Sequence, residues 1–136
     1  MATTLAVVEA HPAIDELPAG SPLAGIARRR FGGKSLLEWV VRRVSDSQRI
    51  GGLVALVSDT PFGRQLVEHC PPDVRVVHGK GNDPLGILAQ AARSLPCQAI
   101  VRLNVGHPFV DPDLIDRLIA TAESKPCDYA SFAFSD

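Results

Sequence analysis

The stretch of sequence that decides the fold is VRLNVGHPFVDPDLID, residues 101–116. The apolar run at 99–103 predicts a buried strand. Asp111 followed by Pro112 predicts the start of a helix, with the aspartate as N-cap and the proline in the first turn. In open α/β sheets, ligands bind in the crevice beyond the carboxyl ends of the strands. The loop between these two elements is therefore expected to line a ligand site.

The remainder of the chain alternates between strand patterns and helix patterns. Short apolar runs predict strands, and apolar residues three and four positions apart predict helices. The expected strands cover residues 4–9, 53–57, 74–77, 99–103 and 128–134, and the expected helices cover 35–44, 61–69, 84–94 and 111–123. Repeated strand–helix units imply right-handed crossovers and a mostly parallel sheet between two layers of helices. We expect a three-layer α/β/α, Rossmann-like fold with strand order 3-2-1-4-5.

Local motifs mark where the helices begin. Ser35 with Glu38 three residues later is a capping box, and Asp83 before Pro84 is an N-cap followed by proline at the favoured first position. Residues 11–34, rich in Pro, Gly and Ala, form a connection too long for an ordinary loop. Loops of that length are usually functional, so we expect this connection to border the ligand site.

The composition indicates one globular domain, residues 1–136, with an aliphatic core. Hydrophobic residues make up 46% of the chain and aromatic residues 5%, a balance suited to a parallel sheet covered by helices. The 14 basic and 15 acidic residues give a net charge of -1, which argues against a general nucleic-acid or membrane-surface role. No apolar run reaches membrane-spanning length. Cys70, Cys97 and Cys127 are isolated and lack metal-ligand spacing, so we expect reduced thiols and a cytoplasmic protein.

Four segments, in chain order, carry a resemblance to a known family. FGGKSLLEWVVRRV (31–44) is similar to L-x-G-K-P-L-L-E-x-V-I-x-R, and VALVSD (54–59) is similar to V-V-A-T-S-D. VVHGKGNDPLGILAQAA (76–92) resembles G-x-E-D-V-L-x-R-x-x-x-A-A, and VRLNVGHPFVDPDLID resembles V-R-I-T-G-D-C-P-L-I-D-P-x-L-I-D. The chain therefore resembles the sugar cytidylyltransferases, which include the CMP-Kdo synthetases, the acylneuraminate cytidylyltransferases and spore-coat polysaccharide relatives.

This resemblance implies a fold of the nucleotide-diphospho-sugar transferase type, C-terminally shortened, and the family's reaction. In that reaction, CTP and a sugar or sugar acid give a CMP-sugar and pyrophosphate, with Mg²⁺ held against the phosphates. The family's members are longer, and their second half binds the sugar and contributes to dimerisation. The expected partners are therefore CTP or another nucleotide, and a homodimer or a partner protein that covers the C-terminal edge strand.

The sequence departs from the family where phosphates and metal would be held. Residues 9–20, EAHPAIDELPAG, stand against Q-A-R-x-G-S-x-R-L-P-G-K. Ala10 agrees, whereas His11 and Glu16 replace two arginines that would neutralise the phosphates. Gly106 stands where the family places an aspartate that holds Mg²⁺, so the family's metal ligands are not found in this sequence. Catalysis by the family's mechanism is expected to be impaired or lost.

The candidate nucleotide-binding cleft gathers residues from the first loop and from the ends of the later strands. Its residues are Ala10, His11, Glu16, Lys34, Asp83, Asn104, His107 and Asp111. Three hypotheses stay open: a cytidylyltransferase-like enzyme, a non-catalytic module retained for dimerisation or partner binding, and a transition-metal site at His11, His107 and Asp111. Against the metal site stands the simpler interpretation that Asp111 only caps its helix and that the histidines lie in loops.

Overall fold

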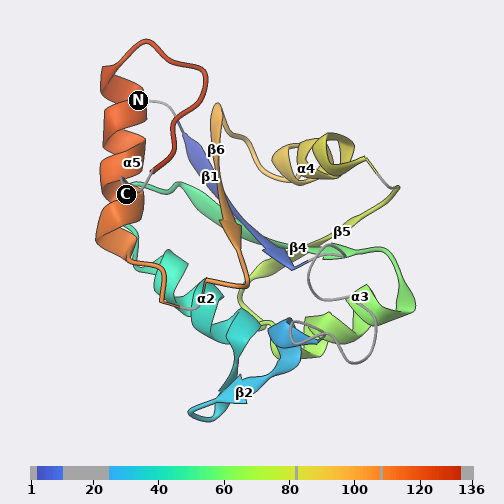
Figure 1. Cartoon of the computed structure of the whole chain (residues 1–136). Helices are drawn as coiled ribbons and strands as arrows, with labels where there is room; N and C mark the ends of the chain where they lie inside the picture. Colours follow the sequence, from blue (N-terminus) through green and yellow to red (C-terminus); the bar gives the residue numbers. More distant parts are fainter. Residues whose placement is uncertain (1–2, 11–24, 82, 108, 133–136) are drawn as a thin grey trace.

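The computed structural model describes residues 3–10, 25–81, 83–107 and 109–132, and within them four parallel strands form the central sheet (Figure 1). The strands are β1 (Thr4–Ala10), β4 (Gly52–Ser58), β5 (Arg75–Gly79) and β6 (Ala99–Asn104), in the spatial order β5-β4-β1-β6. Each neighbouring pair is parallel. When these four strands are numbered 1 to 4 by their order in the chain, their spatial order is 3-2-1-4, as predicted for the first four strands. The mostly parallel sheet is confirmed.

Helices cover both faces of this sheet, which confirms the three-layer prediction (Figure 1). The helices are α2 (Leu36–Ser45), α3 (Pro61–Leu66), α4 (Pro84–Ala92) and α5 (Pro112–Ser124), with 3₁₀ turns at η1 (Ile26–Arg28) and η2 (Val67–His69). α2 and α5 pack on one face, and α4 packs on the other. Each predicted helix is present, although the one predicted for 61–69 divides into α3 and η2.

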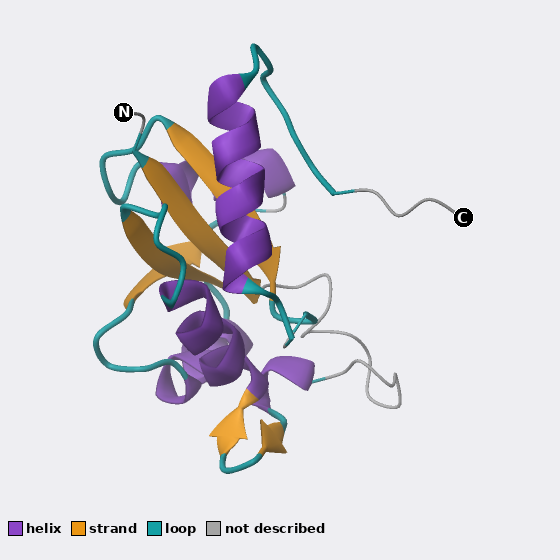
Figure 2. Ribbon diagram, turned by 90° about the vertical axis from the view of Figure 1, so that its left-hand side faces the viewer, coloured by secondary structure: helices purple, strands orange, loops and turns teal. Residues whose placement is uncertain are grey.

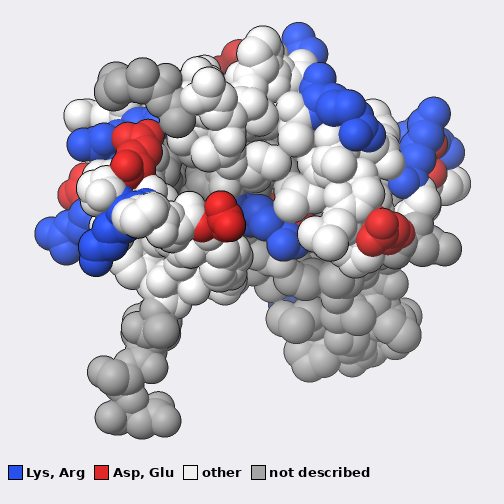
Figure 3. All heavy atoms as spheres, turned by 90° about the horizontal axis from the view of Figure 1, so that it is seen from above, with Lys and Arg blue, Asp and Glu red and all other residues white. Residues whose placement is uncertain are grey.

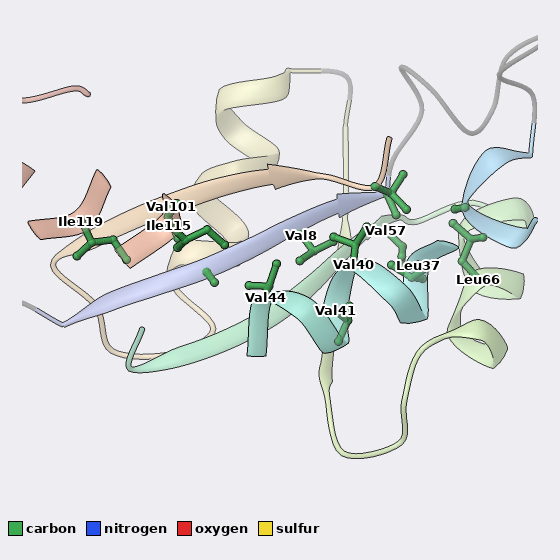
Figure 4. Close-up of a cluster of buried hydrophobic side chains, with 14 residues drawn as sticks. Val8, Leu37, Val40, Val41, Val44, Val57, Leu66, Val101, Ile115 and Ile119 are labelled. Carbon is green, nitrogen blue, oxygen red and sulfur yellow. The ribbon is translucent and has the colours of Figure 1, made fainter. Parts of the chain in front are cut away.

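The core consists of two aliphatic clusters, one on each face of the sheet. In the larger cluster, Val8 of β1 lies beside Val40 of α2, and Val101 of β6 lies beside Ile115 of α5 (Figure 4). The smaller cluster lies under α4 and is formed by Leu5, Val7, Val54, Leu56, Ile87 and Ala91. Burial of one such side chain contributes about 1.5–3 kcal/mol, so these clusters are the main source of stability.

Side-chain caps begin the helices at the Ser, Thr and Asp residues that precede them. The Ser35 hydroxyl accepts from the Glu38 backbone N–H at 3.1 Å, and Thr60 caps α3 in the same way. Asp83 and Asp111 each accept from the backbone N–H two residues further on, at 3.2 and 2.9 Å. The predicted caps at Ser35, Asp83 and Asp111 are therefore confirmed.

The connection predicted to be irregular over residues 11–34 contains regular structure in its described part. η1 is followed by an antiparallel hairpin of β2 (Arg30–Phe31) and β3 (Lys34–Ser35). Gly32 and Gly33, with φ of +58° and +86°, form its two-residue turn. Two successive positive φ values are typical of tight hairpins, and glycine adopts them without strain. The Gly-Gly dipeptide is thus the feature that could have predicted this hairpin.

The strand predicted for residues 128–134 is wrong over the part that the structure describes. Residues 128–132 form no strand, and Tyr129 and Phe132 are 81% and 52% exposed. Figure 2 shows the segment after α5 running away from the sheet. The predicted strand order places this segment beside β6, but among the described residues β6 pairs only with β1, so the alternating pattern is not accompanied by strand pairing. Positions 133 and 134 lie outside the described residues.

Charges of both signs are distributed over the surface. On the face seen in Figure 3, basic and acidic side chains are interspersed among uncharged ones, in keeping with the net charge of -1. Within the described ranges, every helix is too short or too polar to span a lipid bilayer.

Candidate functional site

The carboxyl ends of the four parallel strands lie along one edge of the sheet and define the candidate site. β1 ends at Ala10, β4 at Ser58, β5 at Gly79 and β6 at Asn104, and Glu9 is the register partner of Asn104. The chain places β4 and β5 on one side of β1 and then returns to place β6 on the other side. The topological switch point is therefore the crevice between β1 and β6, where ligands bind in open α/β sheets.

The loop from β6 to α5 is held to this switch point by hydrogen bonds. Asn104 Oδ1 accepts from the Gly106 N–H at 2.7 Å, and the His107 N–H donates to the Asn104 carbonyl at 3.1 Å. Val105 is fully buried, and its N–H donates to the Glu9 carbonyl at 3.2 Å. The loop predicted to line the site is thus attached directly to β1, with the His107 side chain exposed.

An ion pair that the sequence analysis did not single out lies beside the same crevice. Arg102 Nη2 lies 3.0 and 3.2 Å from the two carboxylate oxygens of Glu9, whose side chain is only 11% exposed. Residues two apart in a strand share a face, so Arg102 and Asn104 lie on the same face of β6. A carboxylate that is mostly buried needs such a partner, because burial of an unpaired charge is costly. The polar end of the apolar run TLAVVE is the only sequence feature that pointed to it.

Lys34 lies in the β2–β3 hairpin, at the same end of the molecule as the strand ends (Figure 1). Its ammonium nitrogen is 4.7 Å from the centroid of the Trp39 ring. The Trp39 indole N–H donates to the Phe31 carbonyl, and the rings of Trp39 and Phe31 are 6.4 Å apart in an edge-to-face arrangement. A cation over an indole contributes about 0.5–1 kcal/mol at exposed sites, enough to hold the Lys34 charge near the hairpin turn.

A cavity of about 280 Å³ lies between this hairpin and the loop after β6. Its described lining residues are Arg29, Arg30, Phe31, Leu36 and Phe109. Arg43 Nε donates to the Val110 carbonyl at 2.7 Å and so holds the loop against α2. A second cavity of about 280 Å³, lined by residues such as Thr3 and Gly51, lies at the amino edge of the sheet, away from the switch point.

Asp83 lies at the carboxyl edge but further from the switch point. β4 separates its strand, β5, from β1. Its carboxylate caps α4 while the side chain stays exposed. The turn before it is held by the Gln90 side chain, which bonds the Lys80 N–H at 3.0 Å and the Lys80 carbonyl at 2.9 Å. Asp83 therefore stands at the rim of the candidate site rather than in the crevice.

The structure brings together only part of the candidate set. Ala10 and Asn104 end neighbouring strands at the crevice, and His107 follows three residues later. Lys34 lies in the hairpin, and Asp83 and Asp111 serve as helix caps. His11 and Glu16 lie outside the described residues, so their place in the cleft stays a prediction.

The described residues at this edge do not fit the carboxylate site that the resemblance implies for Mg²⁺. Gly106 has no side chain, the Asn104 amide oxygen already accepts from Gly106, and Asp111 caps α5. Across the described ranges, no three His, Cys, Asp or Glu side chains are arranged to hold a metal ion. Of the alternative transition-metal site, His107 and Asp111 are described and His11 is not.

The chain is similar in sequence and fold to known nucleotidyltransferases. Residues 27–136 match the family model for the MobA-like NTP transferase domain. The spore coat polysaccharide biosynthesis protein SpsF of Bacillus subtilis (strain 168) is 30% identical over 112 residues, which make up 79% of this chain and 47% of SpsF. The fold is similar to that of a CMP:2-keto-3-deoxy-manno-octonic acid synthetase complexed with CTP, with a TM-score of 0.72, 15% identity, and coverage of 91% of this chain and 48% of that one. A cytidylyltransferase from Leptospira borgpetersenii serovar Hardjo-bovis (strain JB197) gives a TM-score of 0.73, 20% identity, and coverage of 91% and 49%.

The chain spans about half the length of these relatives. At the identities of the two solved structures, their likeness shows the fold alone. The family model matches most of the chain, from η1 to Asp136, and so includes the hairpin, the loop after β6 and α5. The chain therefore belongs to the family of MobA-like NTP transferase domains, with cytidylyltransferases among its structural neighbours.

Proposed function

We propose that this domain binds a nucleoside triphosphate, with CTP as the first candidate, in the crevice between the carboxyl ends of β1 and β6. The observation that carries the proposal is the switch point, because the strand order opens a crevice between Ala10 and Asn104. Membership of the NTP transferase family supports a nucleotide as the ligand class. The structural neighbour complexed with CTP supports CTP within that class.

The described residues supply some of the contacts that would hold a bound nucleotide. Ala10 ends β1 at the crevice and has a small side chain, which leaves space for a ligand beyond the end of the strand. An asparagine whose oxygen accepts from Gly106 presents its amide N–H groups to other acceptors, such as base or phosphate oxygens. Lys34 adds positive charge at this end of the molecule, and the exposed His107 adds a ring nitrogen donor.

We further propose that nucleotidyl transfer by this domain is slow or absent. Phosphoryl-type transfer depends on cations and hydrogen-bond donors that stabilise the charge developing on the phosphates. Gly106 contributes no carboxylate for a metal, and the sequence of the first loop replaces two arginines of the family pattern with His11 and Glu16. Both departures remove groups that would contact the triphosphate. They therefore support a domain that binds a nucleotide without transferring its nucleotidyl group efficiently.

Isothermal titration calorimetry with CTP, ATP, GTP and UTP, each with and without Mg²⁺, tests the binding proposal. CTP is expected to bind, and Lys34→Gln should weaken its binding by about tenfold, the equivalent of about 1.4 kcal/mol. Lys125→Gln is the matched control, because this exposed lysine follows α5 at the opposite end of the molecule from the hairpin. Absence of heat and of any thermal shift with all four nucleotides would refute the proposal.

Gly106→Asp tests the explanation for impaired transfer. Positive φ values among the described glycines occur at Gly25, Gly32, Gly33 and Gly81, and not at Gly106, so its backbone accepts an aspartate. The variant should gain a dependence of CTP affinity on Mg²⁺ that the natural sequence lacks, because carboxylate oxygens are preferred Mg²⁺ ligands. An equal Mg²⁺ response in both proteins would show that position 106 is not the cause.

A second candidate is a non-catalytic module for dimerisation or partner binding, in a cytoplasmic setting. The observation that favours it is the edge of β6, which has no neighbouring strand among the described residues, together with the exposed Tyr129 and Phe132 after α5. Unpaired strand edges are templates for association. The unpaired cysteines Cys70, Cys97 and Cys127 support a reducing compartment. Multi-angle light scattering distinguishes the candidates, and a strictly monomeric protein without partners would count against this one.

A further inference from the structure

Arg102 and Glu9 are the charged residues of the two strands that border the crevice. Within residues 4–10 and 99–110, which comprise β1, β6 and the loop after β6, Arg102 is the only lysine or arginine. Its guanidinium Nη2 lies 3.0 and 3.2 Å from the two carboxylate oxygens of Glu9. A triphosphate brings several negative charges to such a site, so its affinity depends on how this one cation is used.

The register of the strands places the pair at the carboxyl edge of the sheet. Arg102 is level with Val7, whereas Glu9 is level with Asn104, the last residue of β6. The contact therefore extends along the last residues of β1 and β6, which run side by side (Figure 1). Val7 belongs to the cluster under α4, and side chains two residues apart in a strand share a face, so the pair lies on the face of the sheet that carries α4.

The contact with Glu9 uses only part of the Arg102 guanidinium. Both short distances involve Nη2, and among the described residues Glu9 is the only hydrogen-bond or ion-pair partner of this side chain. A guanidinium has five N–H donors, so the described residues leave those of Nη1 and Nε for a second acceptor. The Arg102 side chain is 48% exposed, so an anion that enters from solvent can reach it.

Glu9 opposes such an anion because its carboxylate is mostly buried, with a side chain only 11% exposed. A buried carboxylate that loses its cationic partner is costly, and like charges placed side by side repel each other. A phosphate that binds Arg102 therefore either leaves Glu9 unpaired or lies next to its negative charge. In both cases Glu9 lowers the affinity of the crevice for phosphate.

We propose that Arg102 is a phosphate-binding residue of the crevice and that Glu9 competes with the triphosphate for it. The proposal rests on the nucleotide site proposed above and names the cation that meets the phosphates there. In the natural sequence, Glu9 neutralises much of the Arg102 charge, and the triphosphate binds weakly. A neutral side chain of the same shape at position 9 makes that charge available to the ligand.

Calorimetric titration with CTP and with inorganic tripolyphosphate, both in the presence of EDTA, tests this competition. Glu9→Gln should bind both probes about tenfold more tightly than the natural protein does, and Arg102→Gln about tenfold more weakly. When glutamine already stands at position 102, Glu9→Gln should gain less than about threefold, because the guanidinium that it would free is missing. Such non-additivity is the signature of two residues that act through one contact.

Glu123→Gln is the matched control, because it removes the same charge from an ion pair at the amino edge of the sheet, where Glu123 lies 3.6 Å from Arg49. Its affinity for both probes should equal that of the natural protein. Urea unfolding of each variant checks that it is folded. If Arg102→Gln alone is unstable because Glu9 is left unpaired, the double variant compared with Glu9→Gln measures the contribution of Arg102, and a loss of about tenfold is expected.

The proposal is overturned if Glu9→Gln binds the two probes no more tightly than the natural protein. It is also overturned if the gain is equally large with glutamine at position 102, since Glu9 then acts without Arg102. An equal gain in Glu123→Gln would overturn it too, because the effect would then be one of overall charge.

The same titrations separate this inference from the proposed function. CTP binding to the natural protein that neither Glu9→Gln nor Arg102→Gln changes refutes only the role of the pair. Binding by Glu9→Gln where the natural protein responds to no nucleotide refutes the proposed function and supports the competition. Absence of heat for both probes in all the proteins refutes both.

Discussion

At the scale of single residues, Gly63 is a position where the fold leaves no room for a side chain. A Cβ built there would lie 2.0 Å from the Ser58 carbonyl oxygen and 2.5 Å from its hydroxyl oxygen. Ser58 ends β4, and its hydroxyl is 2.8 Å from that of Thr60, the cap of α3. The clash is thus with backbone in the tight turn from strand to helix, which cannot move without disturbing both elements.

Gly63→Ala should therefore destabilise the protein by about 2–3 kcal/mol, the upper part of the range for overpacked sites. Gly86→Ala is the matched control in α4, because its nearest atom is the end of the flexible Asp83 side chain, 3.2 Å away. There alanine should be neutral or stabilise by up to about 1 kcal/mol through its helix propensity. Urea unfolding followed by circular dichroism measures both changes, and similar losses in the two variants would contradict this account.

Cys70 and Cys127 are expected to differ in reactivity because their surroundings differ. Burial raises the pKa of the Cys70 thiol to about 11, and the nearby Asp73 carboxylate adds to this, while Arg42 acts in the opposite direction. Cys127, in contrast, is exposed. The thiolate is the reactive form, so a raised pKa removes most of the nucleophile at neutral pH.

Cys70 should accordingly react with iodoacetamide at pH 8 at least about tenfold more slowly than Cys127, after allowance for the greater intrinsic nucleophilicity of a high-pKa thiolate. Peptide mass spectrometry over a time course measures both rates in one sample. The same reaction in concentrated urea is the control, since unfolding should bring the two rates together. Equal rates in the folded protein would show that the pKa of the half-buried Cys70 thiol is not raised.

At the scale of elements, Asp116 joins α5 to the loop between α2 and β4. Its carboxylate accepts from the Ser47 hydroxyl and from the backbone N–H groups of Gln48 and Arg49, both at 3.1 Å. Desolvation alone would raise the pKa of Asp116, but these hydrogen bonds and the Arg49 charge outweigh it and lower the pKa. The folded state therefore favours the ionised carboxylate more than the unfolded chain does.

A lowered folded-state pKa gives stability that is present above the unfolded value of about 3.9 and is lost as the pH falls through the folded value. Asp116→Asn should destabilise the protein at pH 7 by about 1 kcal/mol, a modest figure because the group is largely solvated. The difference from the natural protein should shrink below about pH 4. Urea titrations from pH 3 to 7 test this, with Asp113→Asn on the same helix as control, and a difference that stays constant with pH would exclude the carboxylate as its source.

The elements also show how far the sequence predicts the fold. Apolar runs predict the four parallel strands because helices cover both faces of the sheet, and apolar periodicity predicts the helices because each buries one face. Ser35, Asp83 and Asp111 predict where helices begin. The pattern fails at residues 128–132, because alternation is a local property and does not show whether a segment pairs with the edge of β6. The hairpin was missed for the opposite reason, since Gly32-Gly33 is a local feature inside a connection interpreted as irregular.

At the scale of the whole molecule, the position of the site was predictable and its side-chain geometry was not. The expected doubly wound strand order is the one observed, and it places Ala10 and Asn104 on either side of the switch point. The pairing of Glu9 with Arg102 could not be predicted, because it joins residues far apart in sequence through the register of β1 and β6. The cavity between Phe31 and Phe109 depends in the same way on two connections meeting in space.

The last prediction at this scale concerns where the part of the chain that packs into the core ends. α5 ends at Ser124 and contributes Ile115 and Ile119 to the core, whereas the described residues beyond Cys127 form no strand and are mostly exposed. Deletion of residues 129–136 should therefore change the free energy of unfolding by less than about 0.5 kcal/mol.

Ile119→Ala is the contrasting variant. Truncation of this buried side chain should lower the free energy of unfolding by about 2–5 kcal/mol. Urea unfolding at two protein concentrations, with light scattering of both variants, separates folding from association. A stability loss above about 1 kcal/mol on deletion, independent of concentration, would mean that the segment packs on its own body. A loss that shrinks as the protein is diluted, together with a fall from dimer to monomer on deletion, would instead place the segment on a second copy, where the edge of β6 has no neighbouring strand among the described residues.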